Sequence, residues 1–195
     1  MADTDELSHQ LAGEAPLDER AAQAGERFSS VGENVAIGTD TPGIQEGWME
    51  SPGHRENILR PQFTALGVGV VRANGAFYAV EDFSTAVEDL SIGEQEEKVR
   101  SLLTARGFHV VRDRGEARKY CVENYTAAHQ SAMSILRLET PDLNTISGEV
   151  DSRLRGVGYR TAEVGACPAA KSERGVARFR VVILLFANAE DATPP

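Results

Sequence analysis

A strand–turn–strand pattern near the middle of the chain is the strongest local constraint on its fold. Two runs rich in valine and aromatic residues flank the tetrapeptide Ala-Asn-Gly-Ala, whose central pair is Asn74-Gly75. Asn-Gly is typical of the two-residue turn of a β-hairpin, because both central positions of a type I′ turn need a positive φ. Residues 64–84 are therefore predicted to form a hairpin.

The segment before this hairpin predicts a short helix with sharp ends. Ser51 suits the N-cap position, Pro52 then falls at the first helical position, and Pro61 stops the helix. Residues 41–50 are predicted to form another helix, with Trp48 on its apolar side. Three further predictions complete this half: interrupted helical structure over residues 1–28, a helix over residues 16–25, and an irregular strand or tight turn at the sequence GENVAIG, residues 32–38.

The pattern changes after about residue 90. Amphipathic helices are predicted over residues 93–106 and 142–155, because their apolar residues recur every three or four positions. Residues 116–125 predict a short helix or turn. Apolar runs predict four strands, at residues 108–111, 131–139, 159–167 and 177–186. The chain is thus expected to be an α+β protein with two domains, residues 1–86 and 91–188.

The composition excludes some partners. The formal net charge is −10, and a chain this acidic repels phosphate backbones, so no nucleic-acid partner is expected. No apolar run approaches the roughly 18 residues of a membrane-spanning helix, so no membrane span is expected. Met1–Glu6 is acidic and lacks the apolar stretch of a signal peptide.

Three motifs together resemble a known family. They are LSHQLAGE (residues 7–14), GENVAIG, and WMESPGHRENILRPQFTALGVGVV (residues 48–71). Their order and spacing resemble the bacterial CAP or SCP domain, the superfamily of cysteine-rich secretory, antigen 5 and pathogenesis-related proteins, over residues 5–84. The resemblance implies a three-layer α-β-α sandwich and a secreted protein, extracellular or periplasmic. The remaining half is expected to be a small α+β domain of an unrecognised family.

The beginning of the chain departs from the family pattern. Family members usually start with a long helix that packs across the sheet, whereas only about eight residues precede His9. We therefore expect an incomplete N-terminal helix and an N-terminally truncated chain, which also accounts for the missing signal segment. A sheet with one uncovered face exposes an apolar patch. The second domain, or the partner subunit of a homodimer, is the expected cover.

The resemblance also implies a site. In many family members a cleft holds two histidines and two acidic residues, and His9, Glu33 and His54 match three of them. The fourth position is Ser51 here, so Glu50 is the nearest acidic substitute. Two imidazoles and a carboxylate can hold a divalent transition metal, for which zinc is the default. The alternatives are a His54 ring bonded to a neighbouring carboxylate, and a Glu33 that accepts backbone N–H bonds or orients a histidine.

The functional expectation follows from this site. The chain is interpreted as a secreted, non-catalytic CAP-domain protein whose His/Glu cleft binds a divalent metal or a small or lipid-like ligand. The first alternative is a metal-dependent hydrolase, in which the metal activates water and a carboxylate serves as general base. The second is an extracellular interaction module with a vestigial cleft.

The two cysteines, Cys121 and Cys167, are not in a C-x-x-C pair, so a structural zinc site is poorly supported. Because the resemblance points to an exported protein, a disulfide between them is the expected use. The alternative is a pair of buried free thiols.

Overall fold

The structure is a computed structural model that describes residues 1–111, 115–123, 134–156, 158–169 and 175–187. Its contacts divide the chain into two compact units. Unit 1 comprises Met1–Val87 and Lys171–Ala177, and unit 2 comprises Glu88–Ala170 and Arg178–Pro195. The described residues contain six helices and two separate sheets. The α+β class predicted from the sequence is therefore confirmed.

Unit 1 is built on a three-stranded antiparallel sheet with the order β1-β3-β2. The predicted hairpin is confirmed: β2 (Ala65–Ala73) and β3 (Ala76–Ala86) are joined by Asn74 and Gly75, with φ of 52° and 80°. GENVAIG is not an irregular strand or a turn. It lies in β1 (Phe28–Gly38), which pairs with β3 in one register from Ser30 onward because β3 supplies a partner at every position.

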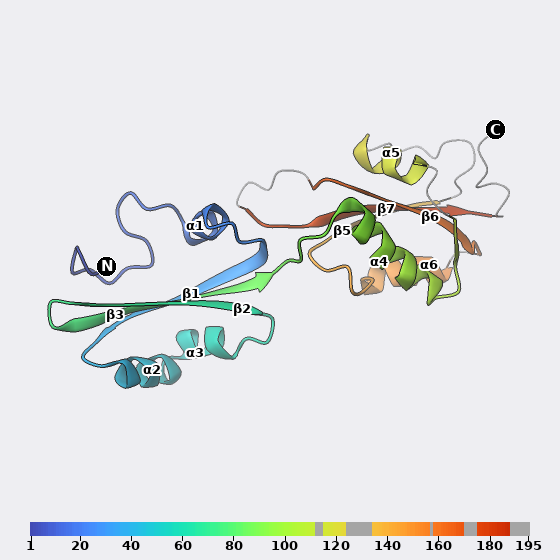
Figure 1. Cartoon of the computed structure of the whole chain (residues 1–195). Coiled ribbons are helices and arrows are strands. Elements are labelled where there is room, and N and C mark those ends of the chain that lie inside the picture. The colour runs from blue at the N-terminus through green and yellow to red at the C-terminus, as the bar shows by residue number, and fades with distance from the viewer. Residues whose placement is uncertain (112–114, 124–133, 157, 170–174, 188–195) are drawn as a thin grey trace. The chain divides into compact units, whose positions relative to one another are not determined.

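Helices lie on both sides of this sheet, as Figure 1 shows. Helix α1 (Leu17–Gln23) lies on one side together with the N-terminal segment, and α2 (Thr41–Glu50) and α3 (Pro52–Leu59) lie on the other. All three were predicted. The expectation of further helical structure before α1 is wrong, because residues 1–16 form only turns and bends.

The alternation of side chains along β1 separates these two sides. Ile44 and Trp48 of α2 pack with Ala79 of β3 in a small core, so Trp48 is a core residue, as expected. A Cβ on Gly32 would meet the side chains of Phe63 and Asn57, and one on Gly38 would meet Ile44. The even-numbered positions of β1 therefore face α2 and α3. Its odd-numbered positions face the side of α1.

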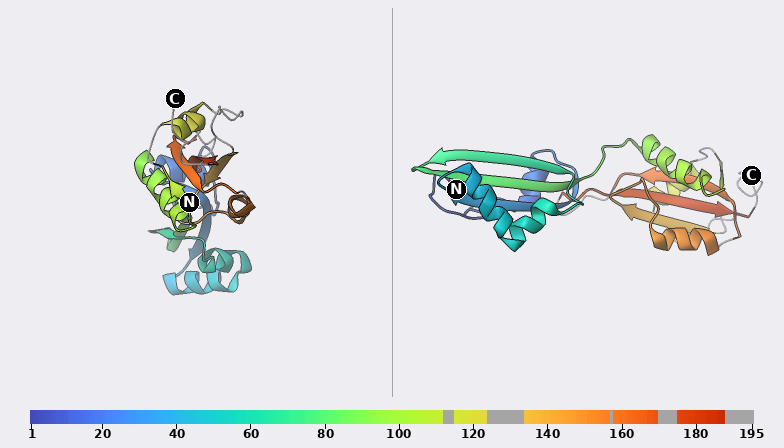
Figure 2. Two further views of the ribbon diagram at one scale, coloured as in Figure 1. Left: turned by 90° about the vertical axis from the view of Figure 1, so that its right-hand side faces the viewer. Right: turned by 90° about the horizontal axis from the view of Figure 1, so that it is seen from below.

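Unit 2 is a four-stranded sheet with the order β4-β6-β7-β5, in which β4 runs parallel to β6 and the other pairs are antiparallel. Figures 1 and 2 show α4 and α6 on one side of the sheet and α5 on the other. The strands are β4 (His109–Val110), β5 (Ser134–Thr140), β6 (Thr161–Cys167) and β7 (Phe179–Phe186). The helices are α4 (Ile92–Thr104), α5 (Glu116–Val122) and α6 (Gly148–Gly156).

Helix α6 is shorter than the pattern predicts. Asp142 Oδ1 accepts from the backbone N–H of Asn144, and Thr140 Oγ1 accepts from that of Asp142. These side chains compete for backbone donors and hold residues 140–145 in a turn. Leu143 and Ile146 of the predicted stripe are still buried, but they precede the helix.

Helix α5 is fastened to the sheet by a disulfide between Cys121 and Cys167, with a Cα–Cα distance of 5.7 Å. The expected disulfide is therefore present, and the free-thiol alternative is wrong. Gly165 in β6 allows the helix to approach, because a Cβ at that position would overlap the backbone of Ala117 and Arg118. The seven-residue α5 is too short to be stable alone, so these contacts determine its position.

Candidate functional site

Glu33 is the centre of a polar cluster on the α1 side of the unit 1 sheet. Its side chain is only 4% exposed. Its Oε1 lies 2.9 Å from Nδ1 of His9, and its Oε2 accepts from an Nη of Arg20 at 2.9 Å. The same Nη also donates to the His9 carbonyl at 3.0 Å. Arg20, a residue that the sequence analysis did not single out, thus holds His9 over the carboxylate.

A second carboxylate lies beside Glu33. Asp82 in β3 pairs directly with Glu33 in β1, so both side chains point to the same face. Burial and the neighbouring Glu33 carboxylate raise the pKa of Asp82, while Arg20 opposes this shift. Asp82 thus adds a second acidic residue to the cluster, from another strand. No sequence signal identified it, because it depends on the register between β1 and β3.

Two groups of this cluster are available for a ligand. The His9 side chain is 62% exposed. An ionised Glu33 can only accept, so the His9 Nδ1 carries the proton in their contact and Nε2 of the neutral ring is left as an acceptor. In contrast, Nε of Arg20 is buried and has no hydrogen-bond partner among the described residues. The site therefore combines one exposed acceptor with one unused buried donor.

His54 is not part of this cluster. It lies on α3, and its backbone carbonyl accepts from Nδ2 of Asn34 at 3.2 Å. Asn34 follows Glu33 in β1, and neighbouring residues of a strand point to opposite faces. Asn34 also donates to Glu81 and accepts from Asn57, so this buried amide fastens α3 to the sheet. Asn34 and Asn57 are thus structural, and Asn57 and Glu81 were missed by the sequence analysis.

The described contacts join the expected zinc ligands only in part. His9 and Glu33 meet, but no hydrogen bond or ion pair of the described residues joins the His54 ring to either of them. Glu50 is exposed at the end of α2, the helix that covers the opposite face. Within the described ranges, no group of three or more His, Cys, Asp or Glu side chains is placed to hold a metal ion. The contacts of the described residues thus join His9 to Glu33, and they join His54 to Asn34 through its backbone carbonyl.

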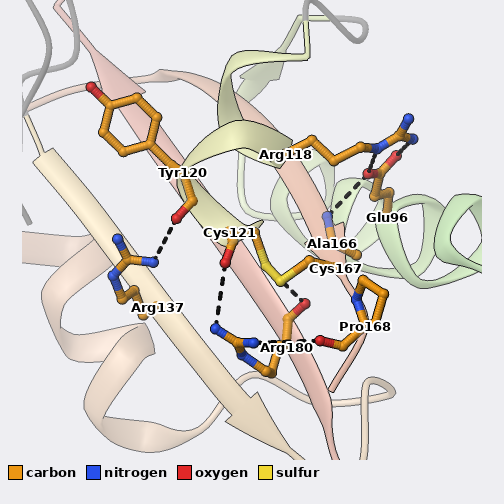
Figure 3. The surroundings of a disulfide bond; sticks show 9 residues. All are labelled: Glu96, Arg118, Tyr120, Cys121, Arg137, Ala166, Cys167, Pro168 and Arg180. Atoms are coloured by element: carbon orange, nitrogen blue, oxygen red, sulfur yellow. Dashed lines mark hydrogen bonds and ion pairs between the residues drawn. A yellow bond between two sulfur atoms is a disulfide. The ribbon is translucent and has the colours of Figure 1, made fainter. Parts of the chain in front are cut away.

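Unit 2 contains a buried carboxylate whose partners are all structural (Figure 3). Glu96 in α4 is 1% exposed and accepts from Arg118, Arg100 and the backbone N–H of Ala166. Burial alone would raise the pKa of Glu96, but these donors lower it below its ordinary value. Glu96 therefore joins α4, α5 and β6.

The arginines beside the disulfide also act on the backbone. Arg137 donates to the carbonyl of Tyr120, and Arg180 donates to the carbonyls of Cys121 and Pro168 (Figure 3). Carbonyls at the end of a helix lack partners within it, so these guanidinium groups cap α5. Of the chain's other two histidines, His109 is exposed in β4 and His129 lies outside the described residues.

No helix within the described ranges is long and apolar enough to cross a membrane.

Comparison with known proteins supports the family resemblance for the N-terminal unit. Residues 1–83 match the family model described as CAP, the cysteine-rich secretory protein family. The chain is similar to the uncharacterized protein YkwD of Bacillus subtilis, with 38% identity over 74 residues. It is also similar to the uncharacterized membrane protein YlbC of the same organism, with 37% identity over 73 residues. Each match covers 37% of this chain.

A solved structure is also similar, an extracellular SCP-domain protein of Bacillus anthracis, with 35% identity over 42% of this chain and a TM-score of 0.37. The chain spans 29% of YkwD, 21% of YlbC and 26% of the solved chain, which is less than a third of each. All these matches cover less than half of this chain. Residues 1–83 therefore match the CAP family, as their three motifs predict.

Proposed function

We propose that this chain is an exported binding protein whose CAP domain takes a small polar ligand at the cluster of His9, Arg20, Glu33 and Asp82. The observation that supports this most strongly is the buried Glu33 carboxylate, which holds an exposed imidazole and a guanidinium whose Nε is unused. A buried donor without a partner is costly. An acceptor oxygen from a ligand removes that cost and provides a driving force for binding.

The chemistry of the cluster favours a ligand that carries a carboxylate or carbonyl oxygen. Nε of Arg20 requires an acceptor, and an anionic oxygen beside a guanidinium makes the stronger bond. The exposed Nε2 atom of the neutral His9 ring adds an acceptor at the same place. A ligand with a carboxylate next to a hydroxyl group satisfies both Nε of Arg20 and Nε2 of His9.

Binding, rather than catalysis, is proposed because Glu33 is already engaged. One oxygen accepts from the His9 ring and the other from Arg20, so the carboxylate is not free to take a proton from water. Export is proposed from two observations. Stable disulfides form in oxidising compartments, and the matching family is named for secretory proteins.

The proposal is tested by NMR titration of the ¹⁵N-labelled chain with acetate and with octanoate, which share a carboxylate but differ in apolar length. We expect chemical-shift changes at His9 and Arg20 with at least one of the two probes. If octanoate binds more tightly than acetate, the preferred ligand is lipid-like. Arg20→Lys, which removes Nε, should abolish these shifts. Arg72→Lys, the same substitution at an exposed position of the hairpin, should leave them unchanged.

Saturable shifts that persist in Arg20→Lys, or a lack of shifts at the cluster with both probes, would contradict the proposal. His54→Ala provides a second comparison, because it removes the family-pattern histidine that lies outside the cluster. The proposal predicts binding of the probes by His54→Ala with the affinity of the wild type.

A further inference from the structure

An apolar stripe runs along β2 without a cover. Leu66, Val68 and Val70 are 55%, 62% and 47% exposed, although all three are aliphatic strand residues. Their register partners in β3 are Phe83, Glu81 and Ala79, and Ala79 belongs to the core beneath α2. The stripe therefore lies on the face that α2 and α3 cover elsewhere. Those two helices pack against β1 and leave β2 open.

The backbone of β2 is open as well. In the order β1-β3-β2, strand β2 pairs only with β3, so its outer N–H and C=O groups have no strand partner among the described residues (Figure 2). The edge of β1 differs, because Val176 forms a parallel bridge with Phe28 and Ala177 donates to the Phe28 carbonyl. One end of the β1 edge is thus occupied, whereas the described residues place no such bridge on β2.

Strand β2 lacks the features by which edge strands avoid pairing. It is nine residues long, contains no proline or lysine, and pairs with β3 without a bulge. Its one charged residue is Arg72, near its end. Protective features of edge strands are charged side chains, prolines, bulges and short length. A long, regular and apolar edge is therefore suited to pairing with another strand.

We propose that β2 pairs with β2 of a second copy of this chain, antiparallel, across a two-fold axis at Val68. An antiparallel register that keeps side chains on matching faces must be centred on a residue, and a centre at Val68 places Leu66 opposite the partner's Val70. On the other face, Gly67 then lies opposite Gly69 and Ala65 opposite Val71. The stripe is self-complementary, and one six-stranded sheet results.

The charges near β2 fit this pairing. In the proposed register Arg72 lies opposite Thr64 and not opposite another arginine, so no like charges meet within the paired strands. The net charge of −10 opposes association of two chains at long range. Because salt screens that repulsion and leaves apolar contacts intact, the dimer is expected to become tighter as salt concentration rises.

Sedimentation equilibrium of the full chain tests the dimer. We expect a concentration-dependent dimer for the wild type, and a dissociation constant raised about tenfold or more in Val68→Lys, because two lysines would then lie directly opposite each other. Val122→Lys is the matched control. Val122 is a valine of nearly equal exposure, 63%, in the other unit, and its substitution should leave the dimer unchanged. A wild type that stays monomeric, or equal effects of the two substitutions, would overturn the proposal.

Cysteine cross-linking tests the register. Residues directly opposite in an antiparallel pair have Cα atoms about 4.5–5.5 Å apart, within the range of a disulfide. Val68→Cys should therefore give a covalent dimer on mild oxidation, joined through position 68 in peptide mapping. In Val70→Cys the two new thiols lie about 13 Å apart along the strands and should not join. Cross-linking that is equal in both variants, or stronger at position 70, would refute the two-fold axis at Val68.

Discussion

Removal of the Cys121–Cys167 disulfide is expected to destabilise unit 2 alone. The double variant Cys121→Ser/Cys167→Ser releases a loop with a sequence separation of 46 residues. In the chain-entropy account, closing a loop of this length stabilises the folded state by about 4 kcal/mol. The other contacts of α5, namely the arginine caps and its close approach at Gly165, remain in the variant. Unit 2 should therefore still fold in water.

Urea denaturation measures this effect with an internal control. The single tryptophan, Trp48, is buried in unit 1, so its fluorescence reports unit 1, while far-UV circular dichroism reports both units. With an m-value of about 2 kcal/mol/M, a loss of about 4 kcal/mol lowers the urea midpoint of unit 2 by about 2 M. The Trp48 transition should stay where it is. Wild-type protein treated with a reductant should behave like the double variant.

Two outcomes would refute this reasoning. An unchanged circular dichroism transition would mean that the disulfide does not constrain the unfolded chain. An equal shift of the Trp48 transition would mean that the two units unfold together, which contradicts their separate contact networks.

Two further predictions concern single residues. Burial and Glu33 raise the pKa of Asp82 above its ordinary value of 3.8, so the folded state holds this proton more tightly than the unfolded state. The resulting stabilisation is present below pH 3.8 and is lost as the pH rises through the raised pKa. Asp82→Asn should remove this loss and increase the free energy of unfolding at neutral pH by a few tenths to about 1 kcal/mol, since Asp82 is partly exposed to solvent. Chemical denaturation at several pH values measures this change. A variant whose stability has the same pH profile as the wild type would contradict the raised pKa of Asp82. Gly165→Ala should destabilise unit 2 by about 1–3 kcal/mol, because its methyl group would overlap the backbone of α5. Gly93→Ala, where the added Cβ meets no atom within 4 Å, is the control. Equal urea midpoints for the two variants would show that α5 does not pack as closely against β6 as described.

Local signals in the sequence predicted most of the helices and strands. The bounds of α2 and α3 follow from proline and capping positions, and the hairpin follows from Asn74-Gly75, because these residues act within a few positions of themselves. Strand β1 was missed as a regular element since its glycines indicate irregularity locally, whereas continuous pairing with β3 overrides that preference. Strand pairing between distant parts of the chain cannot be read from a short stretch of the sequence.

The candidate site was predicted only in part, for a related reason. His9 and Glu33 were identified from their motifs, and the structure brings them together. Asp82 and Arg20 were missed because their positions depend on strand register and on how α1 packs. His54 was grouped with the cluster by the family pattern, but Asn34 fastens its helix to the other face of the sheet. The alternation of a strand separates residues that a motif treats as one set.

The contact between His9 and Glu33 is the central claim, and ¹⁵N NMR of the histidine side chains tests it most directly. At alkaline pH, long-range couplings show which ring nitrogen carries the proton in each of the four histidines. The structure predicts that the neutral His9 ring carries its proton on Nδ1, and that this tautomer is no longer the main form in Glu33→Gln. It also predicts that the His54 ring does not respond to that substitution. A His9 ring protonated mainly on Nε2, or unaffected by Glu33→Gln while His54 responds, would contradict the account.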